Sequence, residues 1–207
     1  MSKEPGLQLN ISVPDIEQVQ AQMLTMKNKA PLVIQRAINN TIKQVSKDVG
    51  NEAKKVYVIS QTEVKKTLST KKATKRDLTG IVSSSDDKKP RLYGFKVDPK
   101  TVITNPADKP EAYAARIKKR VKEKPLTGNQ ERSKAFVARM KSGHIGVFER
   151  MEGRKTSSGK EKLAELYGMS IPNMVKSREV AIEIQSKGQT YLQTQVQKEI
   201  RRVMGIK

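Results

Sequence analysis

The chain of 207 residues carries a formal net charge of +21, from 42 Lys and Arg against 21 Asp and Glu, and only 35% of its residues are hydrophobic. So little apolar material builds one modest domain with helical extensions and excludes two large cores. The chain has no cysteine, which excludes disulfides, thiolate catalysis and Cys-ligated zinc. Like charge at this density opposes compaction unless an acidic partner neutralises it, and nucleic acid is the leading candidate.

The N-terminal residues, MSKEPGLQLN, lack the apolar core of a signal peptide, and no apolar run is long enough to cross a bilayer. We therefore expect no export by a signal peptide, no membrane-spanning segment and no membrane partner. A reducing cytosol suits the composition.

The first thirty residues predict an arm and a short helix. Apolar residues alternate with polar ones from Leu7 to Val13, the period of a half-buried strand, and Pro14 ends the run. Asp15 is placed to cap a helix that runs towards Asn28. Residues 1–30 are thus expected to form an N-terminal arm.

Pro31 marks either a kink or the start of a second helix, and a long amphipathic helix is predicted from there onwards. Its apolar residues recur at three- and four-residue spacing and form one stripe: Ile34, Ile38, Ile42, Val45, Val49, Ala53 and Val56. The opposite face carries Arg36, Lys43, Lys47 and Lys54. Ser60 and Glu63 then form a capping-box pattern, which predicts a short helix over residues 61–68.

Extended segments dominate the middle of the chain. Apolar residues at 78–82, 92–97 and 102–103 are separated by turn-forming residues, and 113–117 reads as a further strand. Residues 135–140 are expected to pair with 147–151, whereas 153–162 reads as an exposed polar loop. Together these segments predict one antiparallel sheet of four to six strands.

The C-terminal part returns to a helical pattern after Pro172, with apolar residues at Met174, Ala181, Ile184, Tyr191, Leu192, Val196, Ile200 and Val203. Glycine inside a helix costs about 1 kcal/mol relative to Ala, so a bend or break is expected near Gly188. The predicted fold is α+β, with the long N-terminal and C-terminal helices packed on one face of the sheet and extended terminal arms. The expected domain boundaries give an α+β domain over 31–187 and a helical extension over 188–207.

The most distinctive part of the sequence lies between residues 140 and 174. It consists of MKSGHIGVFER, a charged Gly/Ser run and ELYGMSIPNM. Gly143 and Gly146 supply backbone freedom around His144. An apolar strand follows, and Ser170 can cap a helix that has Pro172 in its first turn.

Together with AINNTIKQV at residues 37–45, these blocks resemble the minor tail protein Z family of tailed phages and prophages, over about residues 31–180. The residues of the two later blocks that we take as an interface or family motif are Gly143, His144, Gly146, Phe148, Leu166, Tyr167, Gly168, Ile171 and Pro172. Met169 stands where a Pro is expected in such proteins, and 153–162 is longer and more polar than usual.

The resemblance implies a tail-completion protein and not an enzyme. Such a protein forms a homo-oligomeric ring at the head-proximal end of a long tail, where it joins the tail terminator to neck or connector proteins and surrounds the passage for double-stranded DNA. A hexamer is expected from the usual symmetry of tail tubes. The implied location is the tail of the virion, with the host cytoplasm as the place of assembly.

No pattern of catalysis or metal binding accompanies this resemblance. His144 is the one histidine, so a multi-histidine metal site or a Cys/His nucleophile is excluded; we expect a turn residue that bonds the backbone, with a subunit-interface or pH-sensitive contact as alternatives. Asp86 and Asp87 lie in turn composition, SSSDDKKP, which favours a solvated turn over a Mg²⁺ site. There is no GxxxxGK[ST] or GxSxG motif. We expect no catalytic residue, no cofactor and no metal.

The densest positive run lies between residues 109 and 124, and its cations are Lys109, Arg116, Lys118, Lys119, Arg120, Lys122 and Lys124. Because aromatic residues are few, these cations predict sequence-independent contact with phosphates, from a strand with a mobile loop that lines the DNA channel. A solvated surface and a contact with acidic protein are the alternatives. On charge alone, the chain could also be a cytosolic, sequence-independent nucleic-acid-binding protein. The oligomeric state of the purified protein would distinguish this alternative from a tail protein.

Overall fold

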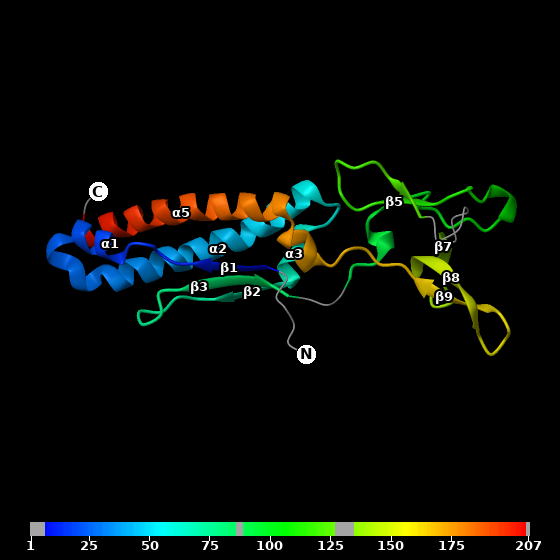
Figure 1. Ribbon diagram of the computed structural model, residues 1–207, viewed down its shortest axis with the longest axis horizontal. Helices are drawn as coiled ribbons and strands as arrows, with labels where there is room; N and C mark the ends of the chain where they lie inside the picture. Colours follow the sequence, from blue (N-terminus) through cyan, green and yellow to red (C-terminus); the bar gives the residue numbers. More distant parts are fainter. Residues whose placement is uncertain (1–6, 86–88, 127–134, 206–207) are drawn as a thin grey trace. The chain divides into compact units, whose positions relative to one another are not determined.

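The structure is a computed structural model that describes residues 7–85, 89–126 and 135–205 (Figure 1). The chain divides into two compact units. Unit 1 comprises Met1–Lys54, Ser60–Asp86 and Ile171–Lys207, and unit 2 comprises Lys55–Ile59 and Asp87–Ser170. This division differs from the expected one, in which residues 31–187 formed a single domain, because unit 1 is discontinuous in sequence.

A three-stranded antiparallel sheet forms one side of the core of unit 1. Its strands are β1 (Leu7–Ile11), β2 (Leu68–Lys71) and β3 (Gly80–Ser84), in the order β1-β3-β2. Both outer strands place a residue opposite Val82, which is fully buried. The predicted N-terminal strand is confirmed, and its ends, Leu7 and Ile11, are buried.

The N-terminal helices follow their predicted start signals. Helix α1 (Ile16–Gln22) begins after Asp15, whose carboxylate accepts a hydrogen bond from the Gln18 amide at 2.8 Å. A 3-10 segment, η1 (Leu24–Lys29), leads into α2 (Ala30–Val56). The capping box is also confirmed: Ser60 and Glu63 exchange both hydrogen bonds at the start of α3 (Gln61–Lys66).

Helix α2 is the centre of unit 1. Its predicted apolar stripe is buried from Ile34 to Ala53, because the helix contacts the sheet on one side and α5 on another. A Cβ built on Gly80 of β3 would lie 2.6 Å from Ile38 Cγ2, so this helix sits directly on the sheet.

The C-terminal chain forms α4 (Ile171–Lys176) and α5 (Arg178–Met204). Helix α5 runs alongside α2 (Figure 1), and the Asn40 amide donates a hydrogen bond to Gln195 Oε1 at 3.4 Å. The break expected near Gly188 was wrong, since α5 continues through it. A Cβ at Gly188 would lie 3.3 Å from Val45 Cγ2, so the glycine lets the two helices approach closely.

Unit 2 contains two further antiparallel sheets and little helix. The first has the order β4 (Lys96–Asp98), β5 (Ala114–Arg116), β6 (Lys124–Pro125), with the short 3-10 segments η2 (Leu92–Gly94) and η3 (Pro106–Asp108) nearby in sequence. The second has the order β7 (Ala135–Arg139), β8 (Ile145–Lys155), β9 (Glu161–Glu165). The predicted pairing of 135–140 with 147–151 is confirmed, with Val137 opposite Val147.

Two expectations for this unit were wrong. Residues 102–103 form no strand. Residues 153–162 are largely a β-hairpin and not a loop, because β8 continues past Met151 and pairs with β9 through a register shift. At the tip, the Thr156 amide donates to Lys160 O at 2.7 Å.

The class of mixed helix and antiparallel sheet is confirmed, but the described strands form three sheets of three strands and not one sheet of four to six. Alternating hydrophobicity indicates that a segment is extended without indicating its neighbour, which is why the number of sheets was missed. Among the described residues, no helix combines the length and the apolar content needed to cross a bilayer.

Candidate functional site

His144 lies at the end of the turn between β7 and β8. The Met140 amide donates to His144 O at 2.7 Å, and the Gly143 amide donates to Met140 O at 2.9 Å. Gly143 has a φ of 82°, a left-handed conformation that glycine adopts without strain. The turn therefore fixes the backbone from which the imidazole projects.

Four side chains meet at this point, and we call them the His144 cluster: Arg91, His144, Glu165 and Tyr167. His144 Nε2 lies 2.8 Å from Glu165 Oε1, and Nδ1 lies 3.5 Å from an Arg91 guanidinium nitrogen. Arg91 Nε lies 3.5 Å from Glu165 Oε1, and the Tyr167 hydroxyl donates to Glu165 Oε2 at 3.3 Å. The carboxylate thus holds together three polar groups from three segments of the chain.

The hydrogen-bond partners assign the proton on the imidazole. A carboxylate accepts only, so Nε2 carries the hydrogen that points to Glu165, and Nδ1 presents its lone pair to Arg91. The Glu165 side chain is 14% exposed, whereas that of Arg91 is 59% exposed. The cluster therefore has a shielded acidic centre with a guanidinium and a phenol at the surface, where they can contact a partner.

Both distinctive sequence blocks contribute to this cluster. Strands β8 and β9 place Phe148 opposite Glu165, and the buried Phe148 ring meets the imidazole edge-on with a centroid distance of 6.0 Å. A Cβ on Gly168 would lie 2.4 Å from Phe95 Cε2, so only glycine fits there. The Leu92 amide donates to Leu166 O at 2.9 Å, which ties the segment of Arg91 to the second block.

The structure does not bring all the motif residues together. Gly146, Leu166 and Tyr167 lie in unit 2 with the cluster, whereas Ile171 and Pro172 are buried at the start of α4 in unit 1. The sequence analysis missed Arg91 and Glu165 as members of the site. Glu165 lies within the ELYG block, but no spacing rule connects Arg91 with it.

The predicted basic cluster lies mostly on one element, which we call the basic hairpin: β5, β6 and their connection, residues 114–125. All of the predicted cations except Lys109 lie on it, and Lys109 follows η3. Lys119, Arg120, Lys122 and Lys124 are exposed. Arg116 is half-buried, and its Nε has no hydrogen-bond partner among the described residues.

Part of the connection in this hairpin, for which the sequence predicted a mobile loop, is hydrogen-bonded to the chain at the end of α2. The Val58 amide donates to Ile117 O, and the Lys119 amide donates to Val56 O, both at 2.8 Å. Lys118 Nζ lies 5.6 Å from the ring centroid of the buried Tyr57, a cation–π arrangement. Of the exposed cations, Lys119 therefore stands on backbone that is hydrogen-bonded to the end of α2.

One carboxylate in this region is neutralised locally. Lys96 Nζ lies 2.7 Å from Glu123 Oε1, and this hydrogen bond and charge hold the pKa of Glu123 below its ordinary value of 4.5. The nearby Arg116 lowers the pKa further. Because Lys96 neutralises Glu123, the remaining exposed cations of the hairpin dominate the local potential.

Metal ligands do not converge in the part of the chain that the structure describes: no three His, Asp or Glu side chains lie together there. The pair Asp86 and Asp87, for which a solvated turn was expected, lies outside the described residues.

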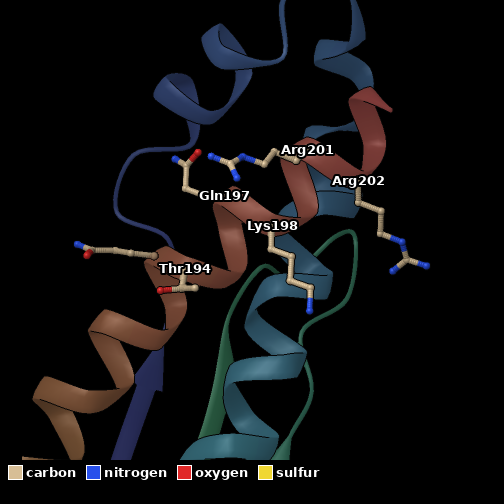
Figure 2. A pocket seen from close by; sticks show the side chains of 6 residues that line it. Thr194, Gln197, Lys198, Arg201 and Arg202 are labelled. Carbon is tan, nitrogen blue, oxygen red and sulfur yellow. The ribbon is translucent and has the colours of Figure 1, made fainter. Parts of the chain in front are cut away.

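A surface that the sequence analysis missed lies at the end of α5. Two rows of side chains at i, i+4 spacing border a groove with a volume of about 660 Å³, which we call the α5 groove; its lining residues are Gln193, Thr194, Gln197, Lys198, Arg201 and Arg202. All six are exposed, and none is a carboxylate. Figure 2 shows Arg201 extending towards Gln197, and Lys198 and Arg202 extending the other way. The i, i+4 spacing of these residues is the sequence signal that predicts this surface.

A polar pocket of about 360 Å³ adjoins the same helix, lined by Leu32, Gln35, Arg36, Asn39, Asn40, Glu199 and Arg202. Glu199 is 3% exposed, and its carboxylate lies 3.9 Å from Arg36 and 3.6 Å from Arg202. Its Oε2 accepts no hydrogen bond from the described residues. Two guanidinium groups therefore compensate this buried charge by proximity.

Comparison with known proteins gives no relative from which a role could be transferred. No protein-family model matches the sequence, no curated protein matches it, and no solved structure matches the fold.

Proposed function

We propose that this chain is a structural virion protein, a tail-completion subunit. Its copies assemble as a ring at the head-proximal end of a long phage tail, join the tail terminator to the neck, and surround the passage for double-stranded DNA. The ring is expected to be hexameric, and the subunit acts by assembly and not by catalysis.

The observation that carries this proposal is the convergence of the two sequence blocks that resemble the minor tail protein Z family. GHIGVF and ELYG lie on paired strands, with Phe148 opposite Glu165, and a hydrogen bond joins His144 to Glu165 at 2.8 Å. The two blocks lie on consecutive strands of one hairpin, so they form one structural unit.

The distribution of charge supports the part of the proposal that concerns DNA. The basic hairpin carries four exposed cations, and a net charge of +21 favours a polyanionic neighbour. A channel through which DNA slides needs many weak phosphate contacts and no base readout. We place the basic hairpin at the channel wall.

Electron microscopy of the purified protein, and of tails assembled with and without it, tests the proposal. The protein should form rings or bind at one end of the tail, and tails made without it should fail to join heads. Tails that join heads normally in its absence would overturn the proposal. A monomer that binds DNA tightly but never binds tails would favour a nucleic-acid-binding protein without a virion role.

A triple reversal tests the place of the basic hairpin. Lys118→Glu, Lys119→Glu and Arg120→Glu should leave ring formation and docking intact and impair DNA retention or ejection. The matched control reverses three exposed cations on the β8–β9 hairpin of the same unit: Arg154, Lys160 and Lys162. If the triple variant fails to dock whereas the control docks, the hairpin binds an acidic protein surface, and the channel position is wrong.

A further inference from the structure

The outward face of α5 changes its charge along the helix. Glu179 and Glu183 are exposed near its start, whereas the α5 groove at its end has no carboxylate. Lys198 and Arg201 have no carboxylate partner among the residues that the structure describes, and Arg202 shares the buried Glu199 with Arg36. The end of the helix therefore presents positive charge to solvent.

A second basic segment of unit 1 is the connection from β2 to β3, residues 72–79, which we call the β2–β3 loop. Its exposed cations are Lys72, Lys75 and Arg76. Asn39 of α2 holds the loop in place, since it accepts from the Ala73 amide at 2.9 Å and donates to Ala73 O at 3.1 Å. Asp77 of the loop forms an ion pair with Lys71, whose Nζ lies 2.9 Å from Asp77 Oδ2. The Asp77 carboxylate therefore does not neutralise the three exposed cations of the loop.

The same turns of α2 lie next to both basic segments. Gln35 and Asn39 contact the β2–β3 loop, and they also line the polar pocket together with Glu199 and Arg202 of α5. Arg36, between them in sequence, lies 3.9 Å from Glu199. Cations from three segments, far apart in the chain, thus surround one part of α2.

We propose that the α5 groove and the β2–β3 loop form a second contact surface for the backbone of double-stranded DNA, separate from the basic hairpin. The groove residues span roughly 14 Å of helix, at about 1.5 Å per residue. Duplex DNA carries about one charge per 1.7 Å of its axis, so several phosphates lie over that length. The Gln193 amide of the groove adds a neutral donor for phosphate oxygens, whereas the Thr194 hydroxyl donates to Thr190 O and the Gln197 amide donates to Gln22 Oε1. No aromatic side chain of the groove offers base stacking.

The identity of this polyanion rests on the proposed function, but the position of the surface does not. Cations at the end of a helix also offset the partial negative charge of its C-terminus. That effect requires no groove, no second basic segment and no shared position on α2. The combination of all three favours an external polyanion as the partner.

The test is binding of the purified full-length protein to a fluorescein-labelled duplex of mixed sequence, by anisotropy over a salt series. The test variant is Lys198→Glu with Arg201→Glu. The control is Lys65→Glu with Lys66→Glu, which makes the same change in charge at two exposed lysines in the last turn of α3, so it perturbs a helix end in the same way. Circular dichroism checks that both variants remain folded.

The test variant should bind the duplex roughly 10- to 100-fold more weakly than the wild type at about 0.1 M salt, and its salt slope should fall by about 2, since each lost phosphate contact removes about 0.9. The control should stay close to the wild type. Equal weakening in both variants would show a response to total charge and overturn the proposal, as would wild-type affinity in the test variant or no duplex binding by the wild type. None of these results decides whether the protein completes tails, which the imaging of particles tests independently.

Discussion

Replacing Gly80 by Ala should destabilise unit 1 although it adds only one methyl group. The new Cβ would lie 2.5 Å from Ile42 Cδ1 and 2.6 Å from Ile38 Cγ2, whereas carbon atoms in contact are about 3.5–4.0 Å apart. Helix α2 or strand β3 must therefore move by roughly 1 Å. Such overpacking costs about 1–3 kcal/mol, and the lower entropy of the unfolded chain with Ala offsets about 0.4–1 kcal/mol of it. The expected net loss is about 1–2 kcal/mol.

Urea unfolding followed by far-UV circular dichroism measures this loss, because nearly all the described α-helical residues lie in unit 1. Gly94→Ala is the control, since a Cβ at Gly94 meets no atom within 4 Å, and its unfolding midpoint should not fall below that of the wild type. Adding Ile42→Val removes the Cδ1 atom, so the double variant should lose less than the sum of the single losses. Strict additivity, or a Gly80→Ala variant as stable as the wild type, would refute the close packing of α2 on β3.

Three further outcomes follow from the contacts described. Ile42→Asp should abolish the folded state of unit 1, because an unpaired carboxylate at a position only 2% exposed costs several kcal/mol against a total of about 5–15 kcal/mol; a melting temperature equal to the wild type would contradict this. Lys96→Ala should raise the pKa of Glu123 towards 4.5, as measured by NMR of the carboxyl group. Because that pKa is lowered in the folded state, the pair's contribution to stability is present above pH 4.5 and is lost as the pH falls through the folded pKa. The single imidazole should show the tautomer with hydrogen on Nε2 in ¹⁵N NMR, and Glu165→Ala should remove this preference; a wild type with hydrogen on Nδ1 would exclude the assigned hydrogen bonds.

The sequence predicted local structure best where a short-range rule applied. The cap at Asp15, the capping box at Ser60 and the apolar stripe of α2 all depend on residues within a few positions of each other, and all are confirmed. Gly188 marks the limit of such rules. Helix propensity alone predicts a break there, but the packing of Val45 against α5 was not visible from the sequence.

The candidate sites show the same limit at longer range. The basic hairpin was identified because its cations are adjacent in sequence. The His144 cluster was found only in part, since Arg91 reaches it from 53 residues away. The α5 groove was not predicted, because the polar face of an amphipathic helix is ordinarily expected to be solvated and to have no binding role. Contacts between segments that are distant in the sequence, and not local propensity, determine which side chains come together in these candidate sites.

The discontinuity of unit 1 has a consequence for how the protein is made. Roughly 120 residues separate the end of α2 from the start of α5, and at about 5–20 residues per second a ribosome needs roughly 6–25 s to synthesise them. During that interval the side of α2 that α5 later covers remains exposed on the nascent chain, while unit 2 leaves the ribosome and can fold. Chaperone demand should therefore peak before the last helix leaves the ribosome. Nascent chains arrested just before α5 should be more prone to aggregation than chains released with it.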